Sequence, residues 1–103
     1  MAVARVALTD ANSAELIATP GAGYRIKVSS LTGSNAGASL STVDLKDGST
    51  KKFSYAMAAN GGGFGFNPAG GWLLTANTAL NVQQSQAVAS YVSVVYAIVG
   101  ATG

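Results

Sequence analysis

Few residue types in this sequence are suited to catalysis. The chain has no histidine and no cysteine, so the commonest general bases, nucleophile activators and zinc ligands are missing. Asp44 and Asp47 are the nearest pair of carboxylates, and two carboxylates can act together as general acid and base. However, Asp47-Gly48 is typical of a turn, and Asp44 falls at a solvent-facing strand position. We therefore expect no catalytic residue, no metal ligand, no cofactor and no enzymatic activity.

A glycine-rich segment, residues 60–71, is the only compositionally biased stretch. A phosphate-binding loop would continue into Lys and Ser or Thr, or would join a strand to a helix. Here the segment leads into Trp72-Leu-Leu-Thr, which is typical of a strand. We interpret it as a sharp bend that brings Phe64, Phe66 and Trp72 together.

The basic residues are few and scattered, although the net charge is +2. They stand at Arg5, Arg25, Lys27, Lys46, Lys51 and Lys52. Because no dense patch is available for phosphate contacts, we expect no nucleic-acid partner. Tyr24, Phe53 and Tyr55 fall on apolar strand faces, where core packing explains them better than stacking on bases.

The polar stretch from Asn77 to Gln86 leaves two interpretations open. Its amide side chains include Asn81, Gln83, Gln84 and Gln86. They could present hydrogen-bonding groups to a glycan or to another protein. They are equally compatible with one neutral, solvent-facing side of a strand.

Alternating apolar and polar residues predict β-strands along most of the chain. In residues 24–29 every second residue is apolar, which predicts a strand with one solvent-facing side. The same period occurs in residues 40–46 and 52–57, and we expect a further strand over residues 3–9. Residues 15–19 fit either a short strand, which we favour, or one helical turn capped by Ser13. Turn signals recur between these runs, and a chain of this kind is typical of a sandwich or barrel. Two of the signals, Asp47-Gly48 and Asn60-Gly61, favour tight hairpins.

The C-terminal stretch, residues 87–99, is apolar on both of its faces. Val92 and Val94 fall on one face, and Tyr91 and Val95 fall on the other. This pattern predicts a strand that is covered on both sides. The second cover is either the opposing sheet or another subunit.

Length and composition predict a single domain, residues 1–103, that associates with copies of itself. The hydrophobic share is 49% and the charged share only 10%, so part of the surface must be neutral or apolar. Exposed apolar surface commonly marks an interface, and we expect a homo-oligomer. The N-terminus lacks the apolar core of a signal peptide, and no apolar run is long enough to span a bilayer. We expect a soluble protein made in a cytoplasm, with no membrane partner.

Four segments resemble a family of small structural proteins of tailed phages. Residues Glu15–Leu31 resemble the opening of that family, in which a glycine turn precedes a basic, alternating strand. Gly63–Trp72, Thr78–Val82 and Tyr91–Tyr96 match the rest of the layout. The resemblance covers Glu15–Val99 and rests on structural and compositional motifs. The family that the chain resembles is that of the small jelly-roll-like capsid decoration (cement) proteins of these phages.

The resemblance implies an antiparallel, jelly-roll-like β-sandwich of about eight short strands. It also implies a homotrimer on the outer surface of the virion, seated where subunits of the major capsid protein meet. We expect residues 1–12 to form an N-terminal arm or an edge strand, with Ala2–Asp10 as the arm. The residues expected at a subunit or capsid interface are Val3, Arg5, Phe64, Phe66, Trp72, Tyr91 and Val95.

An alternative of a different class is a phage fibre or appendage module that binds a cell-surface glycan. It would be favoured by an aromatic platform with Asn and Gln side chains beside it, exposed after trimerisation.

Overall fold

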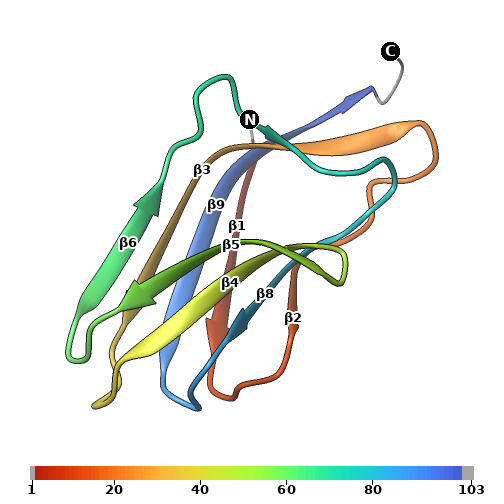
Figure 1. The fold of residues 1–103 in the computed structure, drawn as a ribbon. Helices are drawn as coiled ribbons and strands as arrows, with labels where there is room; N and C mark the ends of the chain where they lie inside the picture. Colours follow the sequence, from red (N-terminus) through yellow and green to blue (C-terminus); the bar gives the residue numbers. More distant parts are fainter. Residues whose placement is uncertain (1, 101–103) are drawn as a thin grey trace.

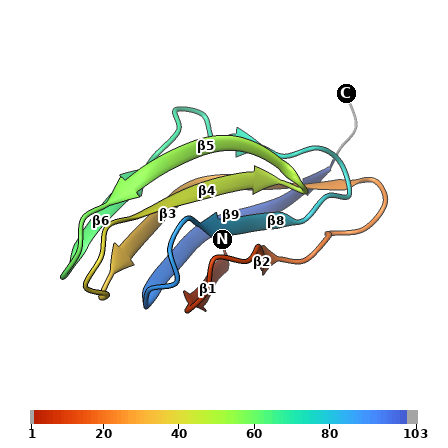
Figure 2. The same ribbon diagram turned by 60° about the horizontal axis from the view of Figure 1, so that its bottom comes forward.

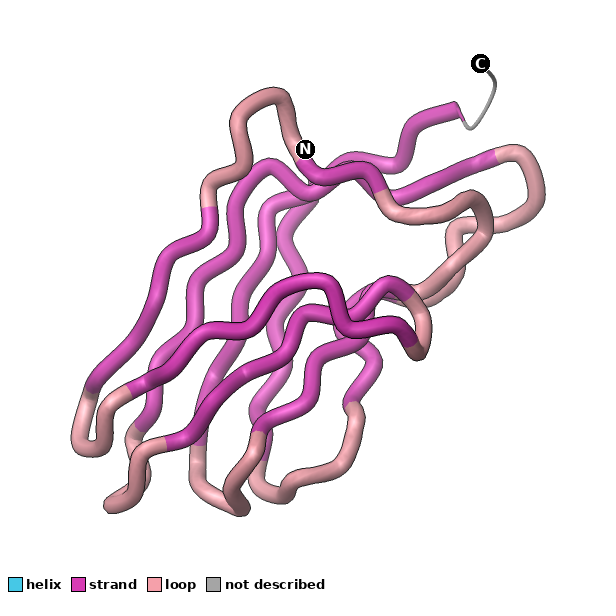
Figure 3. Tube along the Cα trace, viewed as in Figure 1, coloured by secondary structure: helices cyan, strands magenta, loops and turns pink. Residues whose placement is uncertain are grey.

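Two antiparallel β-sheets packed face to face make up the computed structural model, which describes residues 2–100 (Figures 1 and 3). The strands are β1 (Ala2–Leu8), β2 (Ala14–Ile17), β3 (Tyr24–Asn35), β4 (Ser41–Asp47), β5 (Thr50–Met57), β6 (Gly62–Phe66), β7 (Trp72–Leu73), β8 (Leu80–Gln84) and β9 (Ser90–Gly100). Among these residues, no helix has the length and apolar character needed to cross a membrane. The predicted all-β class and antiparallel sandwich are confirmed.

The order of the strands is that of a jelly roll. One sheet has the order β1-β9-β3-β6, with the two-residue β7 also pairing with β3, and the other has the order β2-β8-β4-β5. The chain changes sheet at every connection except the β4–β5 hairpin and the β6–β7 loop. Eight principal strands interleaved in this way form a double-sheet jelly roll. Figure 2 shows the layering, with β4 and β5 curving over β3.

Most predicted strands correspond to observed ones. Residues 3–9, 15–19, 40–46 and 52–57 match β1, β2, β4 and β5, with ends displaced by at most two residues. The C-terminal strand was predicted to begin at residue 87 but begins at Ser90. The residues before it form the β8–β9 loop, in which the Ala89 carbonyl accepts a hydrogen bond from the Ala36 N–H at 2.8 Å.

Strand β3 is longer than the pattern predicted. The alternation in residues 24–29 marked only its first half. The register of β3 against β9 shifts between Val28 and Ser30, so Val28 and Leu31, three residues apart, are both buried. A β-bulge adds a residue and breaks the two-residue period, which is why periodicity ended this strand too early.

One of the two predicted hairpins is wrong. Asp47-Gly48 does begin a tight hairpin between the paired strands β4 and β5. Asn60 and Gly61 also make a sharp turn, with φ of 60° and 101°, but they join β5 and β6, which lie in different sheets. The Asn60 N–H donates to the carbonyl of Gly37 at 2.9 Å. The turn is therefore held by a hydrogen bond to the β3–β4 connection, and it carries the chain from one sheet to the other.

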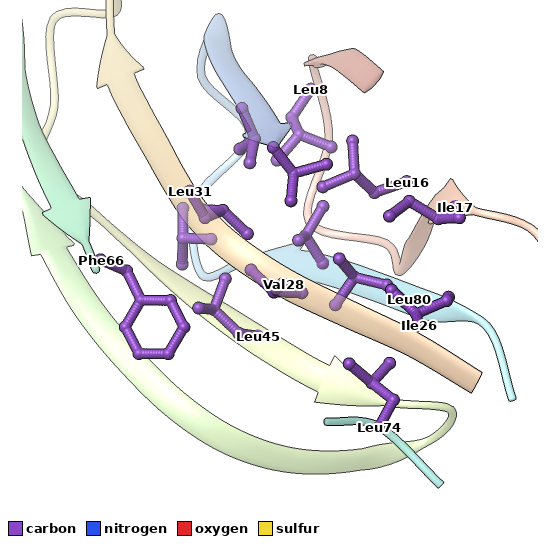
Figure 4. Packing of buried hydrophobic residues seen from close by; sticks show 14 of the residues in the cluster. Leu8, Leu16, Ile17, Ile26, Val28, Leu31, Leu45, Phe66, Leu74 and Leu80 are labelled. Carbon is purple, nitrogen blue, oxygen red and sulfur yellow. The ribbon is translucent and has the colours of Figure 1, made fainter. Parts of the chain in front are cut away.

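The hydrophobic core lies between the two sheets, because every second side chain of each strand points inward. Figure 4 shows the side chains of both sheets in one cluster. The apolar side chains with at most 1% exposure are Ile26, Val28, Leu31, Val43, Leu45, Met57, Leu74, Leu80, Val82, Val92 and Val94.

A buried glutamine ties together the connections at one end of the sandwich. The β1–β2, β3–β4, β5–β6 and β8–β9 connections all lie at this end (bottom of Figure 1). Gln84, 1% exposed, donates from Nε2 to the carbonyls of Asp10 at 3.0 Å and Val88 at 2.7 Å. Its Oε1 accepts from the hydroxyls of Ser90 at 2.7 Å and Ser41 at 3.3 Å. Both ends of the amide are thus satisfied.

A buried asparagine does the same for the β3–β4 connection. Asn35, fully buried, donates from Nδ2 to the carbonyls of Ser39 at 2.8 Å and Met57 at 3.3 Å. Its Oδ1 accepts from the N–H of Gly37 at 2.8 Å. The two amides fix this end of the molecule through side-chain hydrogen bonds, which irregular backbone needs when it is buried.

Candidate interaction surface

The structure separates the predicted interface residues into two groups. Those on β1 and β9, which are Val3, Arg5, Tyr91 and Val95, lie on the outer side of the five-stranded sheet. Those in and directly after the glycine-rich segment, which are Phe64, Phe66 and Trp72, pack against the core. Only the first group therefore lies together on a sheet surface that faces outward.

Strands β1 and β9 place the first group side by side. Their antiparallel register puts Val3 opposite Val95. Val92 and Val94 are buried, so Tyr91, Ser93 and Val95, which alternate with them along β9, point to the outer side of the sheet. Val3 and Tyr91 are 56% and 53% exposed. The opposing sheet covers the inner face of β9. That another subunit covers its outer face stays a prediction.

The N-terminal segment lies in the sheet. Strand β1 pairs with β9 from Ala2 to Leu8, and it is an edge strand of the five-stranded sheet. Val6 packs against the core and Leu8 is buried in it, which explains why this segment stays with the domain. Ala2–Leu8 is thus not an arm that extends from the sheet, and Met1 lies outside the described residues.

The second group belongs to an aromatic cluster between the edge strands β5 and β6. Phe66 is 7% exposed, and its ring centroid lies 4.7 Å from that of Phe53. Trp72 meets the same Phe53 ring edge-on at 5.1 Å. Phe64 stacks on Tyr55 with a centroid distance of 4.9 Å. The glycine-rich segment therefore does bring its aromatic residues together, and they close this side of the sandwich.

Gly33 of β3 provides the space for the Phe64 ring. The two residues are cross-strand partners, and a Cβ added at Gly33 would overlap the ring, with two further ring carbons at 2.9 Å. Gly33→Val is therefore expected to displace the ring from Tyr55 and to lower the free energy of unfolding by about 1–3 kcal/mol, as overpacking does. Urea unfolding measures this loss.

The matched control is Gly65→Val in β6, where an added Cβ meets only Asn67, at 3.8 Å. This variant is expected to keep nearly all of the stability. An equal loss in both variants would show that the position of the Phe64 ring is not the cause.

The two carboxylates considered for catalysis have separate structural partners. Asp44 accepts a hydrogen bond from the Ser54 hydroxyl at 2.7 Å. Asp47 accepts from the N–H of Thr75 at 3.1 Å and from its hydroxyl at 2.7 Å, which ties the β4–β5 hairpin to the segment after β7. The described part of the chain holds no group of three or more potential metal ligands and no pocket.

The amide side chains around β8 bind the chain's own backbone. Gln83 donates to the carbonyl of Ala11 at 2.8 Å, and Asn81 donates to that of Gly48 at 2.7 Å. The structural importance of Gln84 was missed from the sequence. The available signal was its place in the inward-facing series of β8, where the alternation calls for an apolar residue.

No protein-family model matches the chain, and no curated protein matches its sequence. Solved structures do match its fold. A chain in the acidic stable capsid structure of Helicobacter pylori bacteriophage KHP30 has a TM-score of 0.64 at 15% identity, and the match covers 99% of this chain and 93% of that chain. The likeness shows the fold alone. PirA matches with a TM-score of 0.55 at 11% identity, covering 92% of this chain and 93% of its own.

A weaker likeness is to a chain of the virus-like particle of the giant freshwater prawn (Macrobrachium rosenbergii) extra small virus. Its TM-score is 0.46 at 12% identity, with 95% of this chain and 79% of that chain covered. This TM-score is too low to support an inference about the present chain.

Proposed function

We propose that this chain is a non-enzymatic structural protein of a phage virion that decorates and stabilises the capsid. The observation that carries the proposal is the jelly roll shared with a chain of the KHP30 capsid structure over nearly the full length of both chains. In this proposal the protein is made in the host cytoplasm and binds the outer surface of the capsid. It does so as a trimer seated where subunits of the major capsid protein meet.

The physical character of the domain suits this role. A protein that clamps a shell needs a rigid scaffold and extended contact surfaces, and it has no need of reactive groups. The connections tied by Gln84 and Asn35 supply rigidity at one end, and the outer side of β1 and β9 supplies open sheet surface. Three linked copies would bind with high effective concentration even if each contact were weak.

A glycan-binding fibre module has less support. It would need exposed aromatic rings with free amides beside them. Phe64 and Trp72 instead pack on residues of β5, and the amides of Asn81 and Gln83 are engaged by backbone carbonyls. We therefore retain capsid decoration as the proposed function.

Co-sedimentation with expanded capsids that lack the protein tests this function, with unexpanded shells as the control. We expect saturable binding to the expanded shells alone and a higher thermal stability of the decorated particles. By mass action, a ligand that binds only the intact mature lattice stabilises that lattice. Absence of binding to either shell would contradict the proposal, and a glycan array would then test the alternative.

A further inference from the structure

The outer side of the five-stranded sheet carries a largely apolar strip along β9. Strand β9 lies between β1 and β3. Its outward residues, which we call the β9 strip, are Tyr91, Ser93, Val95, Ala97 and Val99. At about 3.3 Å per residue, the strip is about 26 Å long. Val3 of β1 extends the strip sideways at Val95.

Basic side chains lie on both sides of this strip. Arg5 lies beside it on β1, opposite Ser93. Lys27 and Arg25 lie beside it on β3, opposite Ala97 and Val99. Tyrosine and arginine are enriched in protein–protein interfaces, and apolar residues with a charged rim are the usual arrangement there.

Charge is segregated between the two sheets. The strands of the five-stranded sheet carry three basic residues and no carboxylate. The other sheet carries both signs, with Lys46, Lys51 and Lys52 against Glu15, Asp44 and Asp47. The remaining carboxylate, Asp10, lies in the β1–β2 loop. The cations around the β9 strip therefore have no carboxylate on their own sheet.

The cations beside the β9 strip favour a partner surface that carries carboxylates. Two copies of the chain meeting through this face would bring cations against cations, and like charges opposed across an interface are unfavourable. A protein surface with carboxylates around an apolar patch would pair with Arg5 and Lys27 while it covered Tyr91 and Val95.

We propose that the outer side of the β1–β9–β3 sheet is the surface that docks on the capsid, and that the capsid presents carboxylates around an apolar patch there. The inference rests on the proposed function, and it adds the docking face and the chemistry of the partner surface. Because the paired charges lie around the rim, binding depends on ionic strength.

Two charge-reversal variants test this inference by co-sedimentation with expanded shells. Arg5→Glu/Lys27→Glu reverses two charges beside the strip, and Lys51→Glu/Lys52→Glu reverses two exposed charges on β5 of the other sheet. Each pair changes the net charge by −4, from +2 to −2. We expect the first variant to bind about tenfold more weakly and to lose most of the salt dependence. The second should stay within about twofold of the unmodified protein.

The other possible results show whether the docking face or the proposed function is wrong. An equal loss in both variants would show that net charge alone matters, and it would overturn the docking face. Unchanged binding of Arg5→Glu/Lys27→Glu would also overturn it, while the proposed function would stand. No binding of the unmodified protein to the shells would overturn both. A change in oligomeric state caused by Arg5→Glu/Lys27→Glu, seen by analytical ultracentrifugation, would assign this face to contacts between copies instead.

Circular dichroism of each variant establishes that it folds. Lys27 is half-buried and Arg5 is exposed, so Arg5→Glu alone replaces the double variant if the latter unfolds. Its matched control is then Lys52→Glu. The expected loss of binding for the single change is about threefold, since one rim pair is removed.

Discussion

Gln84→Met is expected to lower the free energy of unfolding by about 3–5 kcal/mol, because buried groups would be left without partners. Gln84 bonds the carbonyls of Asp10 and Val88 and the hydroxyls of Ser41 and Ser90. Methionine has a similar volume and length, so little of the loss would come from an empty space. Urea unfolding, followed by circular dichroism, measures the change.

The neighbouring residue provides the control for this variant. Gln83→Met removes an exposed hydrogen bond to Ala11 and a contact with Lys46, and it should cost about 1 kcal/mol or less. If both variants lost the same stability, the bonds of Gln84 would not hold the loop end together. Hydrogen exchange gives a second readout, because the connections that Gln84 joins should exchange faster in Gln84→Met and not in Gln83→Met.

Phe66→Ala is expected to lower the free energy of unfolding of the isolated protein by about 3–5 kcal/mol, as is usual when a buried phenylalanine is truncated. Its ring packs against Phe53 at 4.7 Å and against Trp72 at 6.0 Å. The sequence made Phe66 a candidate for the interface, but at 7% exposure it acts within the chain. Chemical denaturation at several protein concentrations measures the effect and separates it from any contribution of self-association.

Tyr91→Ala is the matched aromatic truncation on the open surface. Tyr91 is 53% exposed, so its loss should change the stability of the isolated chain by about 0.5 kcal/mol or less. A large loss from Tyr91→Ala together with a small one from Phe66→Ala would contradict the assignment of inner and outer faces. In the docking model, Tyr91→Ala instead weakens binding to expanded shells.

The strands that could be predicted are those in which the two-residue period is unbroken. Strand β4 places Ser41, Val43 and Leu45 inward, and the sequence alone defines this face. The second half of β3 could not be predicted, because the bulge before Ser30 changes which residues face the core. Strand β6 was interpreted as a bend because it is rich in glycine, and it is a strand because it pairs with β3.

The sequence could suggest which residue types belong to an interaction surface. It could not show which of these residues the fold brings together. Val3 and Val95 lie near opposite ends of the sequence, and only the pairing of β1 with β9 makes them neighbours. Phe64 and Trp72 were expected at a subunit or capsid interface, because a glycine-rich segment does not define which side chains face the core. Their partners Phe53 and Tyr55 come from the other sheet, and local sequence does not encode such contacts.

The position of β9 between β1 and β3 governs how the chain folds as it leaves the ribosome. At about 5–20 residues per second, roughly 4–16 s pass between the synthesis of Leu8 and that of Ser90. During this interval β1 has no strand to pair with, since β9 is its sheet partner. Unpaired apolar strands of this kind are prone to aggregate. We therefore expect the five-stranded sheet to close only after β9 has been made and has left the ribosome, and the yield of folded protein to depend on keeping unfinished chains apart until then.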